Sequence, residues 1–176
     1  MTTLHLIDAS IYVFRAYHSM PPNFYDQADN LVHAVYGYTS FLLDLRESGI
    51  THASVAFDES LNTCFRNEIY PEYKANRESP DENIKHQFVQ CKKITRLLGF
   101  NTISLKEYEA DDIIGSLCKQ VGEGVDIAIV SRDKDLGQLL RNNDTLWDFA
   151  NNDSMGPAEV EAKFGVPPSK IADFLA

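Results

Sequence analysis

The chain has 176 residues, 44% of them hydrophobic, which is enough to bury the core of one domain. Its net charge of −10 excludes a generally basic nucleic-acid-binding surface, so any contact with a phosphate backbone must come from local basic clusters. No apolar run is long enough to cross a bilayer, and the sequence predicts a cytoplasmic protein with no membrane partner. The three cysteines are far apart, a pattern typical of neither a disulfide framework nor a zinc site.

The first third of the chain predicts a strand, a helix and a second strand. Residues 3–8 form a short apolar run that ends in Asp8, as a buried strand does at a functional edge. Apolar residues recur at helical spacing over 30–47, and a glycine follows as the expected C-cap. The second apolar run, 52–57, again ends in an acid, Asp58.

The next segment, 62–79, is polar and irregular, with basic and aromatic residues interleaved, and we expect it to be an exposed loop. Its basic residues are Arg66, Lys74 and Arg77. Ser79, Pro80 and Glu82 then match a capping box with Ser79 as the cap. This pattern predicts a helix that runs to Gly99.

The second half of the chain continues the alternation of strands and helices. A short strand is expected over 101–104, and a helical apolar stripe follows 109–112, which places the acids of that segment in a first helical turn. Residues 125–130 are the clearest buried strand, and Asp133 and Asp135 follow it. The remaining elements are a last strand over 145–149 and short helices that open at Gly156-Pro157 and Pro167-Pro168. Such alternation predicts an α/β fold, with a mostly parallel central sheet and helices on both faces.

Seven carboxylates hold corresponding places in this pattern, each just after a strand or at the start of a helix. They are Asp8, Asp58, Glu109, Asp111, Asp112, Asp133 and Asp135. Since ligands of open parallel sheets bind beyond the carboxyl ends of the strands, we expect all seven along one edge. Their mutual repulsion would be relieved by divalent cations, and oxygen ligands without His or Cys favour Mg²⁺, with Mn²⁺ as the alternative. Two such ions can activate water against a phosphodiester.

Each acidic motif also has an ordinary structural interpretation. Acids in a first helical turn complement the helix dipole, so Glu109, Asp111 and Asp112 alone are more typical of a cap than of a site. Asp8 or Asp58 alone could cap the following turn. The metal-site hypothesis depends on the recurrence of all the groups at equivalent places.

The motifs together resemble the 5′-3′ exonuclease and flap endonuclease family, over essentially the whole chain. The segments that carry the resemblance are Leu6-Ile7-Asp8, Phe57-Asp58, Phe65-Arg66, Tyr73-Lys74-Ala75-Asn76-Arg77, Tyr108-Glu109-Ala110-Asp111-Asp112, Asp133-Lys134-Asp135-Leu136 and Gly165-Val166-Pro167-Pro168. The resemblance implies a PIN-like or resolvase-like core with a helical-arch insertion at about 62–98. It also implies one catalytic domain over 1–176.

The resemblance further implies a role for each acid. Asp8, Asp58 and Glu109 correspond to ligands of a first metal ion, and Asp111 lies between the two ions. Asp133 and Asp135 correspond to ligands of the second ion, and Asp112 is an additional carboxylate of the bacterial members. These seven residues are the expected metal ligands.

Basic and aromatic residues correspond to the substrate contacts of the family. Lys74 and Arg77 match the catalytic pair at the arch, which would orient the scissile phosphate and stabilise its transition state. The expected DNA contacts are Phe14, Arg15, Arg66, Tyr73, Lys74 and Arg77. Phe14 would stack on a base, although a position in the core explains it equally well.

The chain departs from the family pattern at its C-terminal end. Family members continue past the segment that matches 171–176 into a Gly-Asp loop and a helix-hairpin-helix element that binds duplex DNA. We therefore expect an incomplete second metal site and a missing DNA-binding portion.

The leading hypothesis is a Mg²⁺-dependent 5′-3′ exonuclease and flap endonuclease that acts in replication or repair on DNA with 5′ ends, flaps or nicks. One alternative is a ribonuclease of the related PIN class. The other is a module that binds branched DNA without cutting it. The sequence indicates no oligomeric state.

Overall fold

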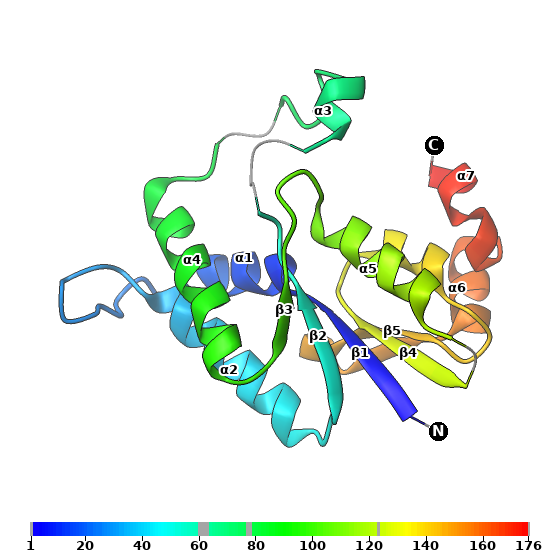
Figure 1. The fold of residues 1–176 in the computed structure, drawn as a ribbon, viewed down its shortest axis with the longest axis horizontal. Coiled ribbons are helices and arrows are strands. Elements are labelled where there is room, and N and C mark those ends of the chain that lie inside the picture. Colours follow the sequence, from blue (N-terminus) through cyan, green and yellow to red (C-terminus); the bar gives the residue numbers. More distant parts are fainter. Residues whose placement is uncertain (1, 60–63, 77–78, 123, 176) are drawn as a thin grey trace.

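A computed structural model describes residues 2–59, 64–76, 79–122 and 124–175. Its centre is a six-stranded sheet with the order β3-β2-β1-β4-β5-β6 (Figure 1). The first five strands in that order are parallel, and β6 is antiparallel to β5. The strands are β1 Thr2–Asp8, β2 His52–Ala56, β3 Asn101–Ile103, β4 Val125–Val130, β5 Thr145–Asp148 and β6 Asp153–Met155. The mostly parallel sheet confirms the predicted fold class.

Helices cover both faces of this sheet, with α1, α2 and α4 on one face and α5 and the C-terminal helices on the other (Figure 1). The α-helices are α1 Ala9–Ser19, α2 His33–Glu47, α3 Arg66–Ile69, α4 Glu82–Leu97, α5 Ala110–Gln120, α6 Pro157–Phe164 and α7 Ile171–Leu175. Three short 3₁₀ helices complete the description: η1 Lys134–Leu139, η2 Phe149–Asn151 and η3 Pro168–Lys170.

The alternation of side chains along the strands divides the core in two. In β1, Ile7 packs with α1, α2 and α4, whereas its neighbour Leu6 packs with α5 and η1. In β4, Val130 and Ile129 divide in the same way. All four side chains are fully buried. The strands are therefore apolar on both faces, as expected of a parallel sheet covered on both sides.

Helix α1 was not among the predicted elements. Its segment contains Ile11, Tyr12 and Val13, residue types that favour strands when considered alone. The helix forms because Asp8 caps its first turn and because Tyr12, Val13 and Ala16 lie buried on one side of it. The whole chain around the segment therefore overrides its local preference.

Three features of the secondary structure differ from the sequence predictions. Helix α4 begins two residues later than the capping-box pattern indicates, and its cap is Asp81, whose carboxylate accepts a hydrogen bond from the amide of Ile84 at 2.8 Å. The prediction of Ser79 as the cap was wrong, because Asp81 offers a carboxylate three residues before a free amide. The segment expected to be all loop contains α3, and β5 is followed by β6 rather than being the last strand.

The expected arch region, 62–98, consists of two unlike parts. Helix α4 lies against α2 and β3, with Ile84, Phe88 and Cys91 buried along one stripe. Residues 64–76, which include α3, stand above the carboxyl end of the sheet, and no residue of α3 is buried (Figure 1). We name residues 64–76 the arch base. Within the described ranges, no helix combines the length and apolar character needed to cross a membrane.

Candidate active site at the carboxyl edge of the sheet

Asp8 is the buried acid of the site. It lies where β1 ends and α1 begins with no residue between them, and its Oδ1 accepts a hydrogen bond from the amide of Ile11 at 3.4 Å. Only 5% of the residue is exposed. Burial, followed by repulsion from Asp111 and Asp58, raises the pKa of Asp8 to about 7. A carboxylate in this position is poorly solvated and is strongly stabilised by a cation.

Asp58 and Asp111 approach Asp8 from the neighbouring strand and from α5. The Oδ1 atom of Asp58 accepts a hydrogen bond of 2.8 Å from the amide of Ala110, the first residue of α5. Asp111 reaches solvent, but partial desolvation, with added repulsion from Asp133, Asp58 and Glu109, raises its pKa to about 6. Acids far apart in the sequence therefore meet at one edge.

Two serine hydroxyls connect the acidic segments. Ser131 follows β4 and is buried; its Oγ donates to Asp8 Oδ2 at 3.0 Å and accepts from the amide of Asp133 at 3.0 Å. Ser10 in α1 accepts a hydrogen bond of 3.2 Å from the amide of Asp58. The sequence analysis assigned neither serine a role. In the sequence, a serine that follows a strand and precedes an aspartate by two residues does indicate a turn in which the side chain bonds to the backbone.

Asp133 and Asp135 lie where η1 begins, after β4. Asp133 caps η1, and its Oδ1 accepts a hydrogen bond of 2.9 Å from the amide of Asp135. Burial and the charge of Asp133 raise the pKa of Asp135. This pair is more exposed than Asp8, and the charge of Asp133 is close enough to contribute to the raised pKa of Asp111.

Glu109 is hydrogen-bonded to three residues of the arch base. Its carboxylate accepts hydrogen bonds from Arg66 Nη1 at 3.1 Å, Tyr73 Oη at 3.0 Å and Lys74 Nζ at 2.5 Å. Lys74 has a φ of +56°, which is a left-handed conformation that is uncommon for a residue with a side chain. The turn that carries Lys74 therefore holds a strained backbone beside Glu109.

Asp112 is also paired with the arch base. Arg66 donates to both of its oxygens, at 2.8 and 2.6 Å, and the amide of Glu109 donates to Oδ2 at 3.0 Å. Although burial alone raises the pKa of Asp112, the hydrogen bonds from Arg66 and Glu109 lower it below its ordinary value. Asp112 is thus neutralised by a cation that Asp8 lacks.

The structure therefore brings the expected acids to one edge without forming a finished metal site. Among the residues that the structure describes, no three carboxylate, His or Cys side chains surround one point closely enough to hold a metal ion. Lys74 and Arg66 lie at this edge, whereas the expected catalytic residue Arg77 lies outside the described residues.

The two expected contacts on α1 are placed away from these acids. Phe14 is partly buried and packs against Phe88, with ring centroids 6.3 Å apart, so the structure gives it a place in the core. Arg15 lines a cavity of about 230 Å³ between α1 and α2, together with Phe41 and Phe149. Arg15 therefore faces a cavity, whereas Phe14 packs against the core.

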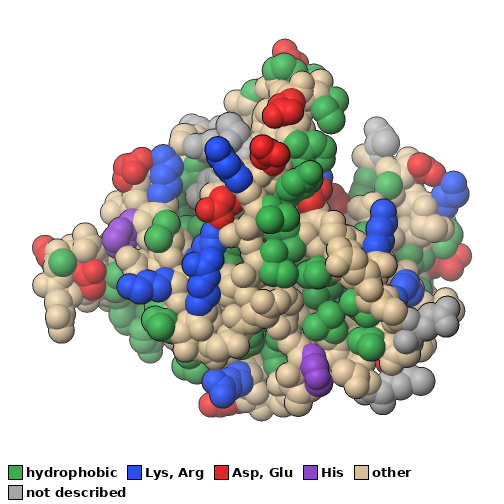
Figure 2. All heavy atoms as spheres, in the orientation of Figure 1, with side chains coloured by type: hydrophobic (Ala, Val, Ile, Leu, Met, Phe, Trp, Pro, Cys, Tyr) green, Lys and Arg blue, Asp and Glu red, His purple; other side chains and the backbone are tan. Residues whose placement is uncertain are grey.

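The surface around the edge mixes charges of both signs. Figure 2 shows hydrophobic and acidic side chains together over the arch base, and basic side chains over α4. Two lysines of α4 are already paired, Lys85 with Glu82 and Lys92 with Glu59. The face seen in Figure 2 is therefore not a uniformly basic surface, in keeping with the negative net charge.

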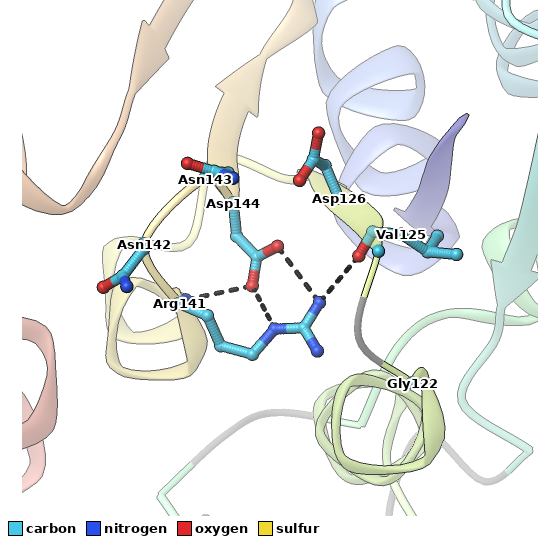
Figure 3. A pocket seen from close by; sticks show the side chains of 8 residues that line it. Gly122, Val125, Asp126, Arg141, Asn142, Asn143 and Asp144 are labelled. Atoms are coloured by element: carbon cyan, nitrogen blue, oxygen red, sulfur yellow. Dashed lines mark hydrogen bonds and ion pairs between the residues drawn. The ribbon is translucent and has the colours of Figure 1, made fainter. Parts of the chain in front are cut away.

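A second polar site lies at the opposite, amino-terminal edge of the sheet. It is an open pocket of about 460 Å³ whose lining includes Asp126, Arg141 and Asp144 (Figure 3). Arg141 donates to Asp144 through its amide at 2.9 Å and through Nε at 2.8 Å. The guanidinium also donates to the carbonyls of Val121 and Val125, at 3.1 and 3.0 Å. Arg141 therefore ties α5, β4 and β5 together.

Solved structures with this fold define its class. The structure of divalent metal ions (zinc) bound to phage T5 5′-exonuclease matches with a TM-score of 0.77 at 20% identity, over 96% of this chain and 64% of that one. The catalytic core of Rad2 in complex with DNA substrate matches with a TM-score of 0.57 at 14% identity, over 97% and 52%. The chain therefore shares the fold of these solved structures.

The sequence comparisons give the family. The model of the 5′-3′ exonuclease N-terminal resolvase-like domain matches residues 3–165. The chain belongs to this family, as its motifs indicate. It is 38% identical to DNA polymerase I of Rhizobium leguminosarum over 98% of this chain and 18% of that protein. It is 34% identical to the 5′-3′ exonuclease of Aquifex aeolicus over 100% of this chain and 61% of that protein. The chain therefore spans less than two thirds of these relatives.

Proposed function

We propose that this chain carries the catalytic edge of a divalent-metal-dependent 5′ nuclease that hydrolyses phosphodiester bonds in DNA with 5′ ends or flaps. The observation that carries the proposal is the convergence of Asp8, Asp58 and Asp111 from three separate elements. Their repulsion contributes to a pKa of about 7 at Asp8. The names of the relatives support the reaction class.

The donor set fits a hard divalent cation. Asp8, Asp58, Asp111, Asp133 and Asp135 offer only carboxylate oxygens, which are the ligands preferred by Mg²⁺ and Mn²⁺. A cation among them removes the repulsion that raises the pKa values of Asp8 and Asp111. When bound, such ions lower the pKa of an attacking water and stabilise the departing oxygen. These five residues would hold the first ion and part of the second.

The residues of the arch base supply the positive charge that a phosphate needs. The side chain of Lys74 is 34% exposed and its ammonium group bonds to Glu109. Lys74 can therefore release this carboxylate and bind a substrate phosphate at the same edge. Tyr73 lies beside it, with its ring 5.1 Å from the Lys74 ammonium. We propose that Lys74 orients the scissile phosphate and stabilises its developing charge, with Arg77 as its partner.

The second metal site belongs to the same proposal. Asp133 and Asp135 are more exposed than Asp8, and they share their loop with Ser131 rather than with a further acid. We propose that this pair binds its ion more weakly than the edge formed by Asp8, Asp58 and Asp111.

Cleavage and metal binding test the proposal together. The chain is incubated with a 5′-flap DNA, and with an RNA flap of the same shape, in Mg²⁺ or Mn²⁺, and Mn²⁺ binding is measured by calorimetry. We expect DNA cleavage that depends on the metal and that Asp111→Asn lowers on the order of 100-fold or more. Preference for RNA supports the PIN-class ribonuclease instead, and DNA binding without cleavage supports a binding module.

Asp126→Asn is the matched control for these measurements. Asp126 lies near the start of β4, at the opposite edge of the sheet from Asp133. Removal of its charge should leave cleavage and Mn²⁺ binding unchanged. Equal losses in Asp126→Asn and Asp111→Asn would refute a site at the carboxyl edge.

A further inference from the structure

The arch base is attached to the body of the protein by polar contacts rather than by a core. Ile69 and Tyr70 are 78% and 56% exposed, so α3 contributes no buried apolar face. Its nearest backbone attachment is the hydrogen bond of 2.9 Å from the amide of Phe65 to the carbonyl of Glu107. The ring of Phe65 lies 5.4 Å from that of Tyr108. The segment from Glu107 to the first turn of α5 is therefore the support of the arch base.

Arg66 is the residue of the arch base with the most contacts to that support. Its two terminal nitrogens bond to the two oxygens of Asp112 at 2.8 and 2.6 Å, a bidentate arrangement that a lysine cannot reproduce. Its guanidinium carbon lies 4.8 Å from the centre of the Phe65 ring and 5.6 Å from that of Tyr73. Stacking and hydrogen bonding thus fix one orientation of the side chain.

Asp112 has few acceptor positions left for a metal ion. A carboxylate has roughly four lone-pair positions. In Asp112, Arg66 uses two of them and the amide of Glu109 uses a third. The charge of Asp112 is already balanced, whereas that of Asp8 is not.

We propose that Asp112 is a positioning residue rather than a metal ligand. By holding Arg66, it fixes the arch base on the first turn of α5, and this places Tyr73 and Lys74 on Glu109. The contacts of Asp112 and Arg66 carry the first step. Only the last step, the presentation of Lys74 to substrate, rests on the proposed nuclease function.

Proteolysis of the arch base tests the first step without any nucleic acid. Chymotrypsin cleavage after Tyr70 and Tyr73 is timed for the wild type, Asp112→Asn, Arg66→Met and the double variant. Loss of a charged hydrogen-bonded pair should raise the rate about tenfold in each single variant. The double variant should be cleaved no faster than Arg66→Met, because that change already removes the contact with Asp112 along with the bond to Glu109. A rate unchanged in Asp112→Asn, or additive in the double variant, overturns the proposal.

Calorimetric titration with Mn²⁺ separates positioning from ligation. Asp112→Asn should bind Mn²⁺ within about twofold of the wild type, because the described hydrogen bonds of Asp112 go to Arg66 and the amide of Glu109 and to none of the five proposed ligands. A loss of tenfold or more overturns the proposal, whatever the proteolysis shows. If the wild type binds no Mn²⁺, the proposed nuclease function fails, and the proteolysis of the four proteins alone decides the role of Asp112.

Flap cleavage at saturating Mn²⁺ adds a measurement that a purely structural role would not change. Asp112→Asn should lower kcat about tenfold in the wild-type background and cause no further loss in Lys74→Ala, because its effect passes through Lys74. An equal loss in both backgrounds overturns that step.

Glu159→Gln is the matched control. Glu159 holds the same position on α6, where its carboxylate accepts a hydrogen bond of 2.9 Å from the amide of Gly156, and none of the arginines that the structure describes pairs with it. This variant should leave the cleavage of the arch base unchanged, and a faster cleavage would show that general loosening explains the result. Thermal unfolding of each variant identifies any chain that fails to fold, and Arg66→Lys then replaces Arg66→Met.

Discussion

The two edges of the sheet each bury an aspartate, and the two residues behave in opposite ways. Asp8 at the carboxyl edge is 5% exposed and Asp144 at the amino edge is 3% exposed. The pKa of Asp8 is raised to about 7, whereas that of Asp144 is lowered. Burial raises both, but the hydrogen bonds of Arg141 outweigh it at Asp144. The partner of a buried carboxylate, rather than its depth, therefore separates a site from a structural contact.

Of the changes considered, Asp8→Asn should most strongly alter the difference between the two edges. Removal of the charge should lower metal-dependent flap cleavage on the order of 100-fold. The same change should stabilise the metal-free protein at pH 8, because it removes repulsion with Asp58 and Asp111 while an asparagine still caps α1. Denaturant unfolding in EDTA checks the second effect. A less stable variant would show that Asp8 acts mainly as a structural residue.

Arg141→Met should have the opposite effect at the amino edge. The variant leaves Asp144 buried without its cation, and it removes the bonds to Val121 and Val125. Because 41% of the Arg141 side chain is exposed, solvent screens part of the loss, and we expect about 2 kcal/mol less stability in urea unfolding. Flap cleavage at a temperature where the variant is folded should stay the same. A matched loss of cleavage would contradict the separation of the two edges.

The stability of the metal-free protein should increase as the pH falls from 8 to 6. The folded pKa of Asp8 is about 7 and lies above its ordinary value of 3.8, so the folded state takes up a proton that the unfolded state does not. Asp111, at about 6, adds to this in the same direction. The slope is at most about 1.4 kcal/mol per pH unit for one proton.

Asp144 contributes in the other direction and in another window. Its lowered pKa stabilises the fold above about 3.8, and this contribution is lost as the pH falls further. In EDTA, the unfolding midpoint should therefore be highest between about pH 4 and pH 6. Excess Mg²⁺ should reverse the trend between pH 6 and 8, since the metal binds the deprotonated acids. A flat profile in EDTA would contradict the raised pKa of Asp8.

Ser131→Ala should give the smallest effect. It removes the hydroxyl that joins Asp8 to the amide of Asp133, at a cost of about 1 kcal/mol in unfolding. Because the hydroxyl orients Asp8, the affinity for Mn²⁺ should fall about tenfold in calorimetry. Ser40→Ala, at an exposed hydrogen bond on α2, is the control and should leave that affinity unchanged.

The sequence predicted the parallel strands and the acids that follow them because both depend on local pattern. An apolar run that ends in an acid such as Asp8 or Asp58 indicates a buried strand of a parallel sheet, with the acid at its carboxyl end. Helix α1 could not be predicted in this way, since Ile11, Tyr12 and Val13 favour a strand until the core of α2 and α4 is present. Helix α1 was therefore missed because its conformation depends on distant contacts.

The pairing of the acids depended even more on distant contacts. Glu109 and Asp112 are equivalent to Asp111 in sequence pattern, yet Arg66 and Lys74 reach only the first two through the described contacts. These partners lie 35 to 46 residues away, and no spacing rule connects them. The sequence therefore identified which carboxylates gather but could not show which of them already have a cation.

The direct junction of β1 and α1 has a consequence for insertions and deletions. Asp8 is the last residue of the strand and the cap of the helix, so no residue is available to absorb a change in length. One added residue would rotate α1 by about 100°, turning Tyr12, Val13 and Ala16 away from the core. The loop between α1 and α2 is longer and exposed, and it could lengthen with little effect. Length variation among relatives is therefore expected after α1 and excluded before it.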